Sequence, residues 1–230
     1  MTEPRVPLRI GGLARFSTVD WPGRLVATVF CQGCPWRCPY CHNPHLLAAR
    51  GAPETQVPWS EVLAFLERRR GLLDGVVFSG GEPTAQTALP DAIRAVRTLG
   101  FRVGLHTAGP WPERLAAVLS DLDWVGFDVK APFEEYAAVT GVLGSGDKAL
   151  ASLRVLLESS VAFEARTTVH PALVDTAMLD RLAGMLANMG VPMFVIQQAR
   201  STAALPVDAG TEDHIISAFA RHEQVAMVRR

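Results

Sequence analysis

This 230-residue sequence has no excess of charge of one sign and no long apolar run. It also has no cysteine outside one short stretch. Its 22 Lys and Arg are balanced by 23 Asp and Glu, so the formal net charge is −1 and no basic surface for nucleic acid is expected. No apolar run approaches the roughly 20 residues that span a bilayer, so no membrane segment is expected either. The chain starts with polar residues and shows no apolar stretch of signal-peptide length. We therefore expect a protein of the cytoplasm, a reducing compartment.

All four cysteines of the chain lie within residues 31–41, which read CQGCPWRCPYC and are followed by His42-Asn43-Pro44. Cysteines this close together, among glycine and proline turn formers, usually share one metal or iron–sulfur centre. In a reducing compartment, clustered cysteines bind metals more often than they form disulfides. The stretch therefore predicts a metal or iron–sulfur site.

Short apolar segments alternate with helical patterns along most of the chain. The predicted strands cover residues 25–30, 75–78, 101–105, 124–127, 162–169 and 193–196, with a possible final strand at 225–228. The predicted helices cover residues 58–70, 89–99, 113–119, 133–140, 147–158, 176–189 and 212–220. This alternation predicts βα units around a parallel sheet. The mostly apolar strands agree with a sheet that is buried on both faces.

The unusual polar residues fall at or near the carboxyl ends of several predicted strands. They are the cysteines, Glu82, His106, Asp128, Arg166 and Gln197. Many strand ends converging on one site is the barrel arrangement, whereas a doubly wound sheet concentrates its site at one switch point. We therefore predict an α/β fold, a partial (β/α)6 TIM-type barrel with parallel strands. One domain is expected over residues 1–230, with an N-terminal extension (1–24), a core barrel (25–200) and a C-terminal helix and possible strand (201–230).

The cysteine spacing admits three interpretations. A closed zinc site would use two knuckles, Cys31/Cys34 and Cys38/Cys41, but such knuckles are usually about 12–20 residues apart so that they can converge. A ferredoxin-like electron carrier uses a run whose spacing differs from this one. In the third interpretation Cys34, Cys38 and Cys41 bind a [4Fe–4S] cluster. Three thiolates leave one iron without a protein ligand, and an open position is typical of a catalytic metal site.

This three-cysteine spacing after the first strand, with Ser79-Gly80-Gly81-Glu82-Pro83 after the second, resembles the radical SAM superfamily. The resemblance implies a [4Fe–4S] cluster whose open iron is chelated by the amino and carboxylate groups of S-adenosylmethionine. It also implies that an electron from the cluster cleaves the sulfonium and yields methionine and a 5′-deoxyadenosyl radical that abstracts hydrogen. Cys31 would then stand outside the ligand set, as a small buried hydrophobe.

The same resemblance assigns residues to the cosubstrate. Glu82 would bind the methionine amino group, with Gly80 and Gly81 allowing close backbone approach. An ordinary turn would explain the two glycines equally well. Tyr40, just before the last cysteine, would pack near adenine, a role compatible with core packing.

Three further residues are predicted to line the pocket for S-adenosylmethionine. Arg166 would grip the methionine carboxylate bidentately, unless it forms a structural ion pair with Glu164 or another acid. Asp128 and Lys130 share a strand face and match the Asp-x-Lys pattern of similar activating enzymes. A salt bridge between those two residues is the alternative.

Residues 16–23 and 32–44 resemble the glycyl-radical-enzyme activases, and the chain is similar to the activating proteins of anaerobic ribonucleoside-triphosphate reductase. This resemblance implies a partner glycyl radical enzyme, the anaerobic ribonucleotide reductase large subunit, from which a glycine hydrogen is abstracted. Reduced flavodoxin or ferredoxin would be the electron donor. The alternatives are a radical enzyme acting on a small molecule, such as a carboxy-deazaguanine synthase, and a non-catalytic zinc-binding or electron-transfer module.

One loop departs from the activase pattern. Residues 106–109 read His-Thr-Ala-Gly, where related activases have Asp-Thr-Asn-Gly or a similar sequence and the aspartate helps to hold a monovalent cation. His106 and Ala108 depart from this pattern, so the resemblance does not carry a cation site over to His106.

Overall fold

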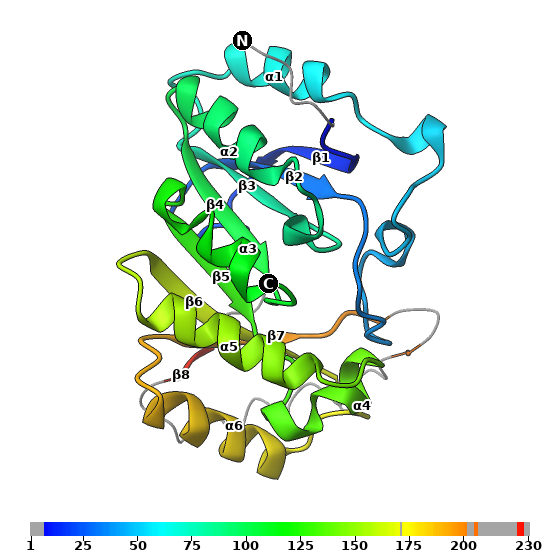
Figure 1. Cartoon of the computed structure of the whole chain (residues 1–230), viewed down its shortest axis with the longest axis vertical. Helices are drawn as coiled ribbons and strands as arrows, with labels where there is room; N and C mark the ends of the chain where they lie inside the picture. The colour runs from blue at the N-terminus through cyan, green and yellow to red at the C-terminus, as the bar shows by residue number, and fades with distance from the viewer. Residues whose placement is uncertain (1–6, 171, 202–204, 207–224, 228–230) are drawn as a thin grey trace.

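The computed structural model describes residues 7–170, 172–201, 205–206 and 225–227. Its strands form one sheet in chain order (Figure 1). They are β1 (Ile10–Ser17), β2 (Val26–Cys31), β3 (Gly75–Gly80), β4 (Arg102–Thr107), β5 (Trp124–Asp128), β6 (Ala162–Val169), β7 (Phe194–Gln198) and β8 (Val225–Met227). β1 pairs with β2 in the antiparallel sense, and every later pair is parallel. The carboxyl ends of β2–β8 therefore meet at one end of the sheet.

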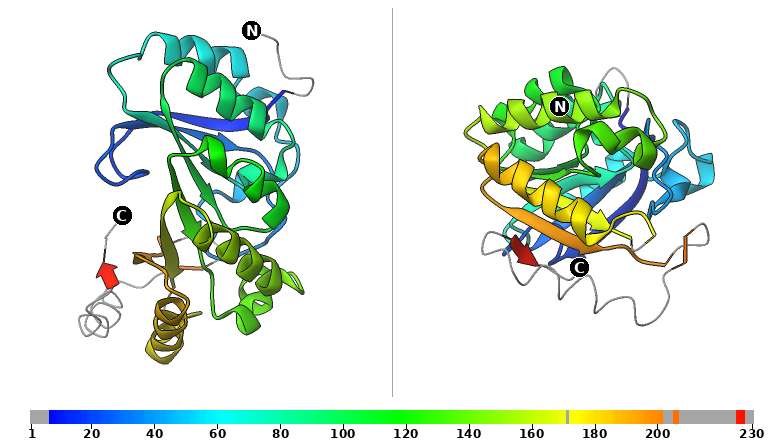
Figure 2. Two further views of the ribbon diagram at one scale, coloured as in Figure 1. Left: turned by 60° about the vertical axis from the view of Figure 1, so that its left-hand side comes forward. Right: turned by 90° about the horizontal axis from the view of Figure 1, so that it is seen from below.

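Helices connect most of the parallel strands, because a parallel pair needs a crossover connection. They are α1 (Trp59–Glu67), α2 (Leu89–Thr98), α3 (Pro112–Ala116), α4 (Tyr136–Thr140), α5 (Ser145–Leu157) and α6 (Thr176–Asn188). Helices α2, α3 and α5 lie across one face of the curved sheet (Figures 1 and 2). The prediction of a parallel α/β sheet with a partial barrel core is confirmed. None of the helices among the described residues is long and apolar enough to cross a membrane.

The sequence analysis did not foresee β1, which lies within the predicted N-terminal extension (1–24) and is an edge strand of the sheet. Gly11 and Gly12 lower the strand signal, and the pairing with β2 shifts register twice, so no clean period of two marks this strand. The possible strand at 225–228 is present as β8, whereas the predicted helix at 212–220 lies outside the described residues.

Successive side chains of a strand point to opposite faces of the sheet, and the residues of β2 follow this alternation. Ala27, Val29 and Cys31 are fully buried in the large core that the helices cover. Val26 belongs instead to a small second cluster, and the hydroxyl of Thr28 donates to Asp20 Oδ2 at 2.7 Å. The sheet thus has an outer face packed with apolar side chains and an inner face that carries polar groups.

Trp21, from the turn between β1 and β2, fills the inner face near the amino-terminal ends of the strands. Its ring stacks on Trp124 with centroids 5.6 Å apart. Glycine is required opposite this ring, because a Cβ on Gly75 or Gly104 would lie 3.2 or 3.0 Å from the indole of Trp21. The two tryptophans form a floor inside the barrel, and the space above them opens toward the carboxyl ends of the strands.

Candidate active site

A cavity of about 460 Å³ lies at the carboxyl ends of the strands. Its wall is made by the cysteine loop and by residues at or just after the ends of β3 to β7. Every residue that the sequence assigned to the site lines this one cavity: Cys34, Cys38, Tyr40, Cys41, Gly80, Gly81, Glu82, Asp128, Lys130 and Arg166. The parallel sheet brings them together from segments that are more than a hundred residues apart.

The cysteine loop is held by backbone hydrogen bonds to the chain that follows it. The amides of Gly33 and Cys34 donate to the carbonyls of Leu46 and Leu47 at 2.8 and 3.2 Å. The Gln32 carboxamide donates to Ala48 O at 2.8 Å and thus binds the loop to the same segment. These bonds hold the start of the loop against the segment that follows it.

The four thiols divide into two classes. Cys31 is fully buried at the end of β2 and points to the outer, apolar face, so it does not line the cavity. Cys34, Cys38 and Cys41 are half-buried, line the cavity and form no disulfide. Burial, and then the charge of Glu82, raise the pKa of Cys34 to about 12. A thiolate here therefore needs a positive centre beside it, which a metal cluster supplies.

Gly80 and Gly81 bring the end of β3 against the cysteine loop. Gly80 has φ of +109°, and a Cβ there would lie 2.5 Å from the backbone nitrogen of Cys31. A Cβ on Gly81 would lie 2.4 Å from the carbonyl oxygen of Gly33. The close approach that these glycines permit is thus between two chain segments. Both residues also face the cavity, and their contact with a cosubstrate stays a prediction.

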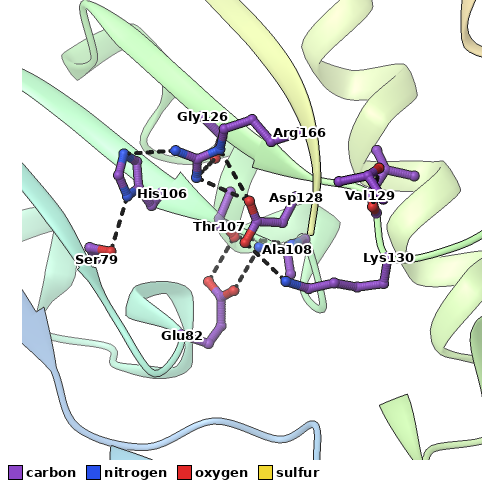
Figure 3. A network of polar contacts seen from close by, with 12 residues as sticks. Ser79, Glu82, His106, Thr107, Ala108, Gly126, Asp128, Val129, Lys130 and Arg166 are labelled. Carbon is purple, nitrogen blue, oxygen red and sulfur yellow. Dashed lines mark hydrogen bonds and ion pairs between the residues drawn. The ribbon is translucent and has the colours of Figure 1, made fainter. Parts of the chain in front are cut away.

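Glu82 is a buried carboxylate with an exposed fraction of 2%. Its Oε1 accepts a hydrogen bond from the hydroxyl of Thr84 at 2.6 Å. Its Oε1 also accepts from the hydroxyl of Thr107 at 2.7 Å, and its Oε2 accepts from Ala108 N at 2.9 Å (Figure 3). Burial raises the pKa of this carboxyl in spite of these donors. Among the described residues no cationic side chain forms an ion pair with it, so Glu82 presents an uncompensated acceptor to the cavity.

Asp128, on the facing wall, has two cationic partners. Lys130 Nζ lies 3.0 Å from its Oδ2, and Arg166 Nε and Nη2 both lie 3.1 Å from its Oδ1. Burial alone would raise the pKa of Asp128, but Lys130 and Arg166 outweigh it and lower the pKa to about 2. The predicted alternative of a salt bridge between Asp128 and Lys130 is therefore present.

Arg166 is engaged on several sides (Figure 3). Besides Asp128 it donates to Gly126 O at 3.2 Å, and its Nη1 lies 3.1 Å from His106 Nε2. A bidentate grip on a ligand carboxylate would have to exchange one of these contacts, and that role stays a prediction. The ammonium of Lys130 donates only to Asp128 among the described residues, and it lies 5.9 Å from the centre of the Tyr40 ring.

His106 joins the inner walls of the barrel. Its Nε2 lies 2.7 Å from the carbonyl oxygen of Asp20, and its Nδ1 lies 3.0 Å from Ser79 Oγ. Burial, and then the neighbouring Arg166, lower the pKa of His106 to about 3, so the imidazole is neutral at pH 7. The sequence did not indicate this network, because its contacts join residues that are 27 to 86 positions apart in the chain.

The residues present fit a [4Fe–4S] cluster with S-adenosylmethionine. Three free thiols border the cavity, and an uncompensated carboxylate suits the ammonium of the methionine moiety. The hydroxyl of Tyr40 is buried beside the cavity and has no hydrogen-bond partner within the described part of the chain. A buried polar atom without a partner is unfavourable unless a ligand completes its bonding.

Residues 28–186 match the family description "Radical SAM superfamily". The chain belongs to the radical SAM superfamily. Members of this family use a [4Fe–4S] cluster and S-adenosylmethionine, so the protein is an enzyme with these cofactors. This membership decides against the closed zinc site and the electron carrier that the cysteine spacing had left open.

Two curated relatives are activating enzymes. A Methanocaldococcus jannaschii protein assigned as a glycyl-radical enzyme activating enzyme is 29% identical over 82% of this chain and 79% of its own length. The pyruvate formate-lyase-activating enzyme of Clostridium pasteurianum is 30% identical over 79% of this chain and 77% of its own. The chain therefore belongs with the activating enzymes of this superfamily.

A solved structure supports the fold. The S-adenosylmethionine-bound SuiB of Streptococcus suis matches with a TM-score of 0.66 at 12% identity, over 86% of this chain and 48% of SuiB. The chain thus spans about half the length of SuiB. At this identity the likeness shows the radical SAM barrel and leaves the substrate undefined.

Sequence reasoning missed the residues that support Glu82. Thr84 and Thr107 hold the carboxylate from two different segments, and only their shared geometry shows it. A polar residue two positions after a strand-end carboxylate was the one local signal for Thr84. Thr107 carried none, because the approach of β3 and β4 at this end depends on the whole sheet.

Proposed function

We propose that this enzyme activates a glycyl radical enzyme, the large subunit of an anaerobic ribonucleoside-triphosphate reductase, by removing one hydrogen atom from the Cα of a glycine. The observation that carries the proposal is the alignment with two activating enzymes along about four-fifths of the chain. Reduced flavodoxin or ferredoxin is proposed as the electron donor.

In this proposal Cys34, Cys38 and Cys41 hold the cluster, and Glu82 receives the ammonium of the methionine moiety. Of the two buried cations beside Asp128, Lys130 has fewer protein contacts than Arg166, so it is the first candidate for the methionine carboxylate. When bound, the cluster and S-adenosylmethionine supply the carbon-centred radical that removes the hydrogen atom. The cavity that would hold both groups is lined by the cysteine loop and by residues at or just after the ends of β3 to β7.

The test is anaerobic reconstitution followed by incubation with purified reductase, S-adenosylmethionine and reductant. Electron paramagnetic resonance should then show a glycyl doublet on the reductase. About four irons and four sulfides per chain are expected for the wild type and for Cys31→Ala. Cys34→Ala, Cys38→Ala and Cys41→Ala should each lose the cluster and all cleavage of S-adenosylmethionine.

Two results would contradict the proposal in different ways. Cleavage of S-adenosylmethionine without a glycyl doublet on any reductase offered would point to a small-molecule substrate. A Cys31→Ala variant without a cluster would show that the thiol on the outer face belongs to the site, against a ligand set of Cys34, Cys38 and Cys41 alone.

A further inference from the structure

The cysteine loop has an outer side that does not border the cavity. Arg37 lies between the proposed cluster ligands Cys34 and Cys38, and its side chain is exposed and takes no part in the cavity wall. The amide of Arg37 donates to Thr140 O at 2.9 Å, so the loop rests against the carboxyl end of α4 (Figure 1). The cluster site therefore reaches the protein surface here, away from the cavity mouth.

The turn between α4 and α5 presents an apolar side chain next to Arg37. A Cβ on Gly141 would lie 3.8 Å from the Cβ of Arg37, which shows how closely the turn approaches the loop. Leu143, two residues further along the turn, is 91% exposed. This surface thus combines a leucine in solvent with the exposed cation of the cysteine loop.

Buried hydrogen bonds fix the conformation of this turn. The hydroxyls of Thr140 and Ser145 are buried and lie 2.7 Å apart, and Ser145 Oγ donates to Val142 O at 2.7 Å. A single exposed leucine is ordinary on a protein surface. Leu143 differs because a hydrogen-bonded turn holds it outward beside the loop that would carry the cluster.

Arg37 adds a positive charge to this surface. Its Nη1 donates to the carbonyl oxygens of Cys34 and Trp36 at 2.6 and 2.9 Å, and no carboxylate forms an ion pair with it in the part of the chain that the structure describes. On the first turn of α5, Asp147 and Lys148 are both exposed and carry opposite charges. The guanidinium therefore remains available to an acidic partner.

We infer that Arg37 and Leu143 form the docking surface for a reduced flavodoxin, an acidic one-electron carrier whose flavin exposes an apolar edge. The inference rests on the proposed function, which needs such a donor. The carrier gives up one electron and the cluster accepts it, and no atom or proton is transferred. Encounters between redox proteins are weak and bury less than about 1,200 Å², so a small patch is sufficient. A carrier on the outer side of the loop also leaves the cavity mouth free for the cosubstrate.

The experiment follows cleavage of S-adenosylmethionine by the reconstituted enzyme at increasing concentrations of reduced flavodoxin, and in parallel with dithionite. Leu143→Asp should raise the flavodoxin concentration at half-maximal rate about 10-fold, because an apolar contact is lost and a like charge is added. Arg37→Glu should raise it by a similar factor and weaken its dependence on ionic strength. Calorimetric titration of flavodoxin into each variant should show the same loss of affinity.

Iron content and cleavage with dithionite, a small reductant that needs no docking, should match the wild type in both variants. Leu143→Asp decides the test if Arg37→Glu incorporates less iron, because a side chain that is 91% exposed supports little of the fold. Matched controls are Leu72→Asp and Arg70→Glu, the same changes at exposed residues near the amino-terminal ends of the strands. Both controls should keep the wild-type dependence on flavodoxin.

Separate results would overturn this inference and the proposed function. Wild-type dependence on flavodoxin in Leu143→Asp would overturn the inference alone, as would an equal loss of cleavage with dithionite. An effect of Leu143→Asp that appears with reduced ferredoxin but not with flavodoxin would overturn the choice of partner. A wild type that cleaves S-adenosylmethionine with dithionite but with neither carrier would overturn the proposed donor, and this inference with it.

Discussion

Glu82 and Asp128 are two carboxylates on facing walls of one cavity, and their surroundings are opposite. Glu82 is held by hydroxyl and amide donors and has no cation beside it in the described part of the chain, so its pKa is raised. Asp128 has Lys130 and Arg166 within 3.1 Å, and its pKa is lowered to about 2.

The difference indicates which of the two carboxylates would be stabilised by a bound cationic ligand. A buried carboxylate without a cation is costly by itself, and a bound ammonium would relieve that cost. Asp128 already has cationic partners and needs no cationic ligand for its stability; Lys130 and Arg166 together exceed its charge by one. We therefore interpret Glu82 as the anchor of the cosubstrate and Asp128 as the residue that keeps two cations in place.

Glu82→Gln should produce the largest effect. It removes the charge but keeps the shape, and we expect affinity for S-adenosylmethionine to fall about 100-fold, equivalent to about 2.7 kcal/mol. Equilibrium binding to the reconstituted enzyme measures this loss. The exposed Glu113→Gln is the control and should bind normally. Unchanged affinity in Glu82→Gln would remove the distinction between the two walls.

Asp128→Asn should act mainly on stability. It leaves Lys130 and Arg166, whose side chains are 13% and 5% exposed, without their shared counter-charge. Loss of one partner from a partly buried ion pair should lower the free energy of unfolding by about 2 kcal/mol, as denaturant unfolding would show. Asp91→Asn breaks a surface pair and should cost less than about 0.5 kcal/mol. A larger loss of binding than in Glu82→Gln would reverse the comparison.

His106→Gln should give the smallest effect, visible as a pH dependence. The pKa of His106 is about 3 in the folded protein and about 6.5 when unfolded, so between these values the unfolded chain binds the extra proton. Stability should therefore fall as the pH drops below about 6.5, and removing the imidazole should reduce this fall by about 0.8 kcal/mol between pH 8 and 6. The exposed His45→Gln should keep the wild-type slope.

The location of the site could be predicted from sequence because it follows from strand direction. Parallel strands carry their carboxyl ends to one edge, so residues after separate strands, such as Glu82 and Lys130, had to meet. Cys31 was set apart because the family resemblance implies three cysteine ligands, and in the structure it is fully buried in the core that the helices cover.

The pairing of Arg166 could not be predicted in the same way. Sequence proximity pointed first to Glu164, which shares its strand face, but the register of β5 against β6 sets Asp128 level with Arg166 and Gly126 level with Glu164. Register between neighbouring strands depends on the packed sheet and leaves no local signal. β1 escaped prediction because its glycines and register shifts hide the alternation that marks a strand.

The floor made by Trp21 and Trp124 has a consequence for the order of events during turnover. Stacked indoles fill the inner face at the amino-terminal ends of the strands, so molecules reach the cavity from the opposite end. A large partner polypeptide resting over that opening would block the passage of small molecules. S-adenosylmethionine should therefore bind before the partner docks, and methionine and 5′-deoxyadenosine should leave only after the partner dissociates. Binding and release would then follow a fixed order, with one turnover for each complex formed.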